Sequence, residues 1–125
     1  MRSREWRLRI EDILETIAKI KRYTAHMTPE DFGNSDLTVD AVIRNLEILG
    51  EASRHVPAEI ETRYSQIPWG KMRSIRNVVI HEYFGVSTSI VWQTIAEDLP
   101  PLVPLLQQIL EEAQDVSPAD YSEAE

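Results

Sequence analysis

Residues 74–85, SIRNVVIHEYFG, place an arginine and a histidine among β-branched apolar residues. Arg76 is a permanent cation whose planar fork suits phosphate oxygens. The imidazole of His81 titrates near neutral pH and can accept or release a proton. Cleavage of a phosphodiester by a 2′-hydroxyl needs both groups, because a base must take the hydroxyl proton while fixed positive charge stabilises the phosphate. This stretch therefore has the residue types for RNA cleavage.

Taken without further evidence, residues of these types more often have structural roles. A histidine near a helix end is often a cap or a hydrogen-bonded core residue. An arginine among aliphatic residues often buries its methylene groups and keeps only its guanidinium in solvent. The other histidines, His26 and His55, lie next to predicted helix ends. The chain has no cysteine, no metal-site spacing of histidines and no glycine-rich phosphate loop. Neither a metal nor a cofactor is therefore predicted.

The charge distribution is uneven along the chain. A net charge of −8 opposes binding to nucleic acid, but all 13 Lys and Arg residues lie at or before Arg76. The stretch from Thr62 to His81 contains no acidic residue. A solvated face is one interpretation of this basic stretch. The other is RNA binding, for which the candidate residues are Arg63, Lys71 and Arg73.

The apolar pattern predicts an all-α protein, an up-and-down bundle of four main helices with short connecting helices. Residues 1–115 form the single predicted domain, and 116–125 form an acidic tail. Asp36 or Thr38 is the expected cap of the second main helix, and a close neighbouring helix is the expected reason for Gly50 within it. The predicted helices are 5–25, one turn after Thr28, 36–55, a short one from 57, 68–83, 87–98, and one beginning at 100–101 that Pro104 bends.

A helical wheel places polar and apolar residues of 68–83 on several sides of that helix. Arg76 lies beside the face of Ile75 and Tyr83, whereas Asn77 and His81 share the opposite side with flanking valine and isoleucine. A helix that is apolar nearly all round must be covered on more than one side. Self-association about a two-fold axis is the commonest solution. We therefore expect a homodimer, which would also supply two histidines for a reaction with two proton transfers.

The residues Arg76, Asn77, His81 and Tyr83 spell R-N-x-x-x-H-x-Y. This pattern resembles the signature of the HEPN superfamily, and specifically of its HepT-like branch. The resemblance covers most of the chain, because three segments match that branch in the same order. They are AVIRNLEILGEASRHVP, IPWGKMRSIRNVVIHEYFGVS and IVWQTIAEDLPPLVPLLQQIL.

This resemblance implies a dimeric bundle and a metal-independent ribonuclease, with tRNA as one candidate substrate. It further implies the toxin of a prokaryotic toxin–antitoxin pair, whose partner is a minimal nucleotidyltransferase antitoxin. If the roles in the family apply to the matching positions of this sequence, Arg76 and His81 are the catalytic pair and Asn77 is the polar residue beside the arginine. Tyr83 is the residue to which the partner adds AMP.

Two other functions remain open from the sequence. One is a non-catalytic helical module that docks a nucleotidyltransferase, and the other is a nucleotide-binding bundle without catalysis. Loss of RNA cleavage on removal of His81 would separate the nuclease from both. No signal peptide or membrane span is expected, so the predicted location is the cytoplasm.

Overall fold

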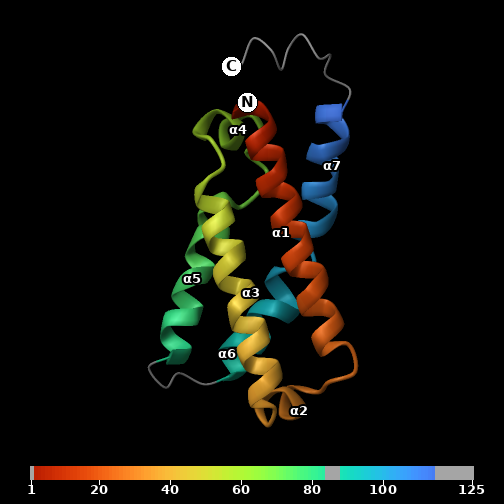
Figure 1. Ribbon diagram of the computed structural model, residues 1–125, viewed down its shortest axis with the longest axis vertical. Helices are drawn as coiled ribbons and strands as arrows, with labels where there is room; N and C mark the ends of the chain where they lie inside the picture. The colour runs from red at the N-terminus through yellow and green to blue at the C-terminus, as the bar shows by residue number, and fades with distance from the viewer. Residues whose placement is uncertain (1, 84–87, 115–125) are drawn as a thin grey trace.

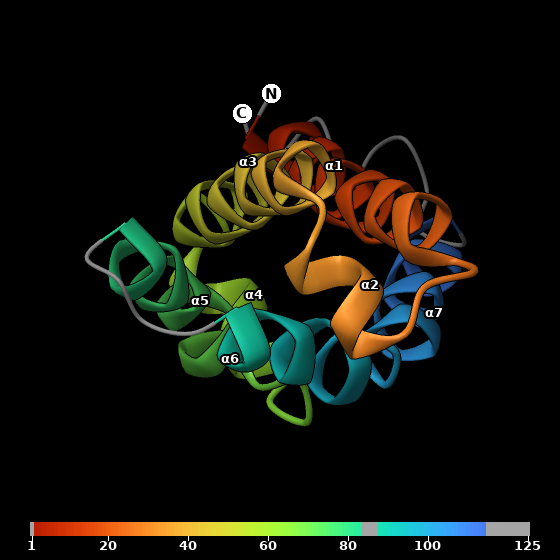
Figure 2. The same ribbon diagram turned by 90° about the horizontal axis from the view of Figure 1, so that it is seen from below.

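The computed structural model describes the backbone of residues 2–83 and 88–114. It describes the side chains of residues 5–77 and 88–112. These residues form helices and no strand, which confirms the all-α prediction. Four long helices lie in the order α7, α1, α3, α5, and the short helices close the other side (Figures 1 and 2). The elements are α1 Arg2–Thr24, α2 Pro29–Gly33, α3 Asp36–Arg54, α4 Ala58–Arg63, α5 Trp69–Tyr83, α6 Thr88–Gln93, the π-helix η1 Thr94–Asp98 and α7 Leu102–Gln114.

Apolar stripes on α1 and α3 form the centre of the core. The α1 stripe recurs every three or four residues, the spacing of one helical face, and α1 packs directly on α3. Ser53 is fully buried in this core, and its hydroxyl donates a 2.8 Å hydrogen bond to the Leu49 carbonyl, which satisfies it. The residues of both stripes are buried throughout: Trp6, Ile10, Ile13, Ile17, Ile20 on α1 and Val39, Val42, Leu46, Leu49, Ser53 on α3.

Local capping chemistry fixes where the helices begin. Thr28 caps α2 through a reciprocal pair of hydrogen bonds with Asp31, as the Thr28–Pro29 pattern predicted. The prediction for α3 was wrong by one residue. Ser35 is the cap, because its hydroxyl accepts from the backbone N–H of Thr38 at 3.2 Å.

The segment after residue 87 differs from its prediction. A single helix was expected over 87–98, but α6 ends at Gln93 and the chain continues as the π-helix η1. The wider π turn changes the direction of successive side chains, and the hydrophobic spacing alone does not reveal it. Pro104 is the third residue of α7, where a backbone N–H has no intrahelical partner to lose. The predicted acidic tail, 116–125, and Gly85 lie outside the described residues.

Gly50 marks the place where α5 crosses α3. A Cβ atom at Gly50 would lie 3.4 Å from the Cβ of Arg76 and 3.7 Å from the carbonyl oxygen of Arg73. The close approach of a neighbouring helix that the sequence predicted for this glycine is therefore confirmed. It also fixes the position of Arg76 against the surface of α3. Within the described residues, no helix is long and apolar enough to span a membrane.

We expect the side chain at position 50 to set the spacing between α3 and α5. Gly50→Ala adds only an ordinary van der Waals contact and gains helix propensity, so its free energy of unfolding should stay within about 1 kcal/mol of the parent. Gly50→Leu overpacks the crossing and should lose about 1–3 kcal/mol. Urea denaturation measures both changes. Gly70→Leu is the control, because a Cβ there meets only the end of the Arg73 side chain, at 3.8 Å. Equal stability of Gly50→Leu and Gly50→Ala would contradict this account.

Candidate active site

The first turns of α5 are anchored in the core. The Trp69 indole is buried and donates a 3.0 Å hydrogen bond to the carbonyl of Tyr64, on the segment that precedes the helix. Met72 and Ile75 follow on the buried face of α5. Because these contacts hold the start of α5, the direction of the helix and the position of the residues that follow are fixed.

Arg76 and Asn77 come next and are both exposed. Arg76 lines a groove of about 310 Å³ between α1, α3 and α5. Of the described side chains, none forms an ion pair or hydrogen bond with its guanidinium. Among the described side chains Arg76 is therefore an unpaired cation at the edge of a groove, which leaves its guanidinium available to a phosphate.

The groove beside Arg76 carries charges of both signs. Its lining contains three arginines and three carboxylates from the three helices, together with the apolar residues Ile48 and Ala52 of α3. The charged residues are Arg9 and Asp12 of α1, Arg44, Glu47 and Glu51 of α3, and Arg76 of α5. The formal charges cancel, so the groove is polar but not strongly positive.

The second half of the motif extends along α5 toward the amino-terminal half of α3. The backbone of His81 and Tyr83 lies within α5, as predicted, and their side chains lie outside the described ones. On an ideal helix, His81 is rotated about 140° from Arg76, whereas Tyr83 is rotated only about 20°. Positions 76 and 81 therefore lie on different sides of an ideal helix.

A second groove continues along the outer surface of α3. It measures about 280 Å³, is lined by Asp40, Ile43, Arg44 and Glu47, and shares the last two with the first groove. Figure 1 shows that α3 and α5 run antiparallel, and they cross at Gly50. The two grooves therefore adjoin each other on α3, and only the first is lined by a described residue of α5.

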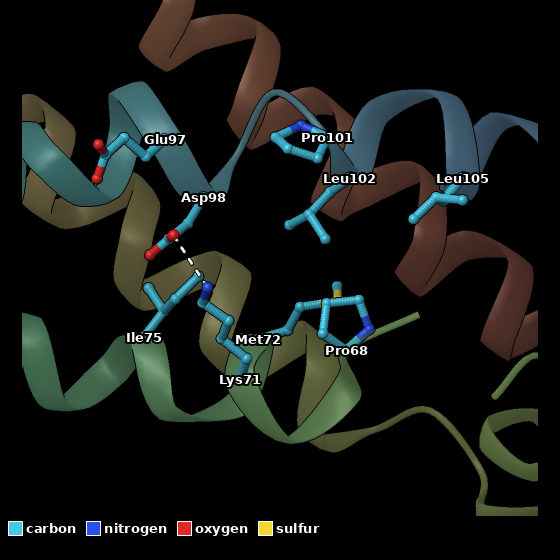
Figure 3. Close-up of a pocket in the computed structure, with 9 residues that line it drawn as sticks. All are labelled: Pro68, Lys71, Met72, Ile75, Glu97, Asp98, Pro101, Leu102 and Leu105. Carbon is cyan, nitrogen blue, oxygen red and sulfur yellow. Dashed lines mark ion pairs between the residues drawn. The ribbon is translucent and has the colours of Figure 1, made fainter. Parts of the chain in front are cut away.

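The predicted RNA-binding residues do not form a continuous basic surface with Arg76. The ammonium of Lys71 pairs with Asp98 at 3.0 Å, at the rim of an apolar pocket of about 130 Å³ between α5, η1 and α7 (Figure 3). Arg73 pairs with Glu61 of α4. Arg63 is exposed at the end of α4. The stretch without acidic residues is thus next to acids from other helices, and the RNA-binding role of these three residues stays a prediction.

Two arginines beside Arg76 were missed from the sequence. Arg9 and Arg44 lie far from the motif along the chain, and only the packing of α1, α3 and α5 brings them to its groove. A search for exposed arginines opposite the apolar stripes of α1 and α3 could have suggested them. In the described part of the chain, no cluster of His, Asp and Glu could hold a metal ion.

Comparison with known proteins gives the same assignment as the motif. Residues 13–109 match the family model described as Ribonuclease HepT-like. A Methanocaldococcus jannaschii protein named "Gamma-glutamylcyclotransferase and putative RNase MJ0434" is 39% identical over 82% of this chain. That match spans only 46% of the relative, so the chain corresponds to about half of that protein.

A relative of more similar length comes from Thermococcus cleftensis. It is named "Probable ribonuclease HepT", and it is 43% identical over 74% of this chain and 84% of its own length. No solved structure matches the chain. The family match covers most of the helical bundle, including the whole of α3 and α5 and the R-N-x-x-x-H-x-Y motif that α5 carries. The chain therefore belongs to the HepT-like family of ribonucleases, within the HEPN superfamily.

Proposed function

We propose that the chain is a metal-independent endoribonuclease toxin that acts on cytoplasmic RNA. The observation that carries this proposal is Arg76, an exposed cation on a groove that no described side chain pairs with, five residues before His81 on the same helix. Membership of a ribonuclease family supports it. The non-catalytic alternatives need neither a free Arg76 nor a histidine at position 81.

The reaction uses two kinds of group. A histidine takes the proton of the RNA 2′-hydroxyl, and the oxygen attacks the adjacent phosphorus while the 5′-oxygen departs with a proton from a second acid. Arg76 binds the phosphate oxygens as negative charge builds on them. The products are a 2′,3′-cyclic phosphate and a free 5′-hydroxyl. Asn77, next to Arg76, orients the phosphate or the attacking hydroxyl.

The active unit is a homodimer whose subunits meet along α5. Two observations support this: α5 lies at the end of the row of long helices (Figure 2), and Asn77 on it is exposed. Within one helix, Arg76 and His81 are about 140° apart around the axis, so they do not share a side. In the proposed dimer, a two-fold axis beside α5 brings His81 of one subunit near Arg76 of the other. The cleft between the subunits then holds both catalytic pairs.

We expect the chain to sediment as a dimer at micromolar concentration. Asn77→Lys should shift it toward the monomer, because a specific interface of standard size tolerates buried like charges near its axis poorly. The matched control is Gln108→Lys on the exposed side of α7, which should leave the mass unchanged. Analytical ultracentrifugation measures both. A monomeric parent protein would refute the shared cleft.

The partner is a nucleotidyltransferase antitoxin that transfers AMP to Tyr83. Position supports this assignment, since Tyr83 ends α5 and lies about 20° from Arg76 around the helix axis. The added phosphate brings negative charge to the same side of α5 as the guanidinium. It therefore competes with RNA for Arg76.

The direct test incubates purified protein with total RNA and with tRNA in excess chelator. We expect cleavage, with cyclic-phosphate ends identified by their resistance to ligation until an enzyme opens the ring. Expression of the chain alone should also slow bacterial growth. A folded dimer that cuts none of these RNAs would instead favour the nucleotidyltransferase-docking module.

A further inference from the structure

The groove beside Arg76 differs chemically from a surface that binds only the phosphate backbone of RNA. Asp12, Glu47 and Glu51 line it together with the arginines, and carboxylates repel phosphate oxygens. A carboxylate is useful beside RNA where it accepts hydrogen bonds from the N–H groups of a base. The half-buried Ile48 in the lining adds apolar surface against which a planar base can lie.

The carboxylates differ in how available they are. The carboxylate of Glu51 is engaged by two residues of the next turn of α3. Its oxygens lie 3.2 Å from the His55 imidazole and 3.7 Å from the Arg54 guanidinium. Among the described residues, Glu47 pairs only with the Arg44 guanidinium at 3.7 Å and Asp12 only with Arg9 at 4.0 Å, both near the limit of an ion pair. Because the Arg44 side chain is 70% exposed, this contact contributes little and is easily exchanged for a ligand.

Arg44 and Glu47 line both grooves along α3 and so lie at their junction. The guanidinium of Arg44 supplies hydrogen-bond donors, and the carboxylate of Glu47 beside it supplies two acceptor oxygens. Guanine carries the matching groups: N1–H and the N2 amino group donate to a carboxylate, while O6 and N7 accept from arginine. Uracil offers one N–H between two carbonyl oxygens, and those oxygens repel a carboxylate.

We propose that this groove is a nucleobase subsite that selects guanine next to the scissile phosphate, with Glu47 and Arg44 reading the base. The proposal rests on the ribonuclease function, in which Arg76 binds that phosphate. The target is single-stranded RNA, because the Watson–Crick edge of a paired base is already occupied.

Binding of uncleavable RNA tests the subsite without any need for catalysis. Short 2′-O-methyl oligouridines carry one central guanine or none, and fluorescence anisotropy gives their dissociation constants. The parent protein should bind the guanine oligonucleotide between about fivefold and about a hundredfold more tightly, the range of one bidentate base contact. Glu47→Gln keeps the size of the side chain but presents an amide donor to a base donor, and should remove this preference.

The control variant is Glu59→Gln, which changes an exposed carboxylate on α4, away from the groove. It should retain the full guanine preference, and thermal melts should show that both variants remain folded. Equal binding of the two oligonucleotides by the parent protein, or a preference that survives Glu47→Gln, would overturn the subsite. Cleavage without a base preference would refute the subsite alone. A Glu47-dependent preference without cleavage would support the subsite and refute the nuclease.

Discussion

Replacement of His81 with alanine is expected to lower RNA cleavage by at least about a hundredfold. A positioned general acid or base contributes about 10²–10⁴ to the rate, and the alanine variant has no group to take its place. The measurement is the single-turnover rate on a defined RNA in the presence of chelator. The matched control is His55→Ala, since His55 is exposed at the end of α3 and, among the described residues, its imidazole makes a polar contact only with Glu51.

Arg76→Ala should reduce the rate by a similar factor for a different reason. Loss of one charged donor to a developing oxyanion costs about 10²–10³. Arg76 is exposed and unpaired with the described side chains, so the stability of the variant should change by no more than about 0.5 kcal/mol. Arg76→Lys should recover only part of the rate, because lysine restores the charge but not the planar fork.

A mixture of the two inactive variants tests whether the site is shared between subunits. If Arg76 of one chain acts with His81 of the other, subunit exchange between Arg76→Ala and His81→Ala restores one complete pair in each mixed dimer. We expect cleavage to reappear as exchange proceeds. If the mixed dimer, verified by mass spectrometry, is inactive, then either both catalytic residues act on the same chain or the reaction needs both histidines of the dimer. Unchanged cleavage by His81→Ala alone would refute the catalytic assignment.

The bundle could be predicted from the sequence because its long helices carry regular apolar stripes. The isoleucines of the α1 stripe, Ile10, Ile13, Ile17 and Ile20, are all buried, as a spacing of three and four residues predicts. Gly50 was also interpretable, because a glycine inside a well-formed helix needs a packing reason. The π-helix η1 was not predictable, since residues 94–98 have a composition that an α-helix accepts equally well.

The environment of the motif depended on tertiary packing and was predicted less well. The spacing of Arg76 and His81 is a local property and is visible in the sequence. The acids that neutralise Lys71 and Arg73 are not local, because Asp98 and Glu61 reach them from η1 and α4. Arg44 likewise enters the groove only because α3 crosses α5 at Gly50.

Tyr83 is expected to be the residue that the nucleotidyltransferase partner modifies. The chain has three other tyrosines. The two that the structure describes lie in other places than Tyr83. Tyr64 is buried between α4 and α5, so its hydroxyl is poorly placed to meet a second enzyme. Tyr23 is exposed but lies at the end of α1, distant along that helix from Arg9 and the groove. Only at Tyr83 does an added AMP share the side of α5 that carries Arg76.

Incubation with the partner and ATP should therefore add the mass of AMP to peptides containing Tyr83 and should stop RNA cleavage. Each AMP adds a phosphate charge and a bulky nucleoside beside Arg76, so inhibition should appear mainly as loss of RNA binding. Tyr83→Phe should stay unmodified, and whatever cleavage it retains should resist the partner, because phenylalanine has no hydroxyl to accept AMP. Tyr23→Phe is the control that should still be modified and inhibited. Adducts on another tyrosine, or inhibition of Tyr83→Phe without any adduct, would show that the partner blocks the cleft by binding rather than by modification.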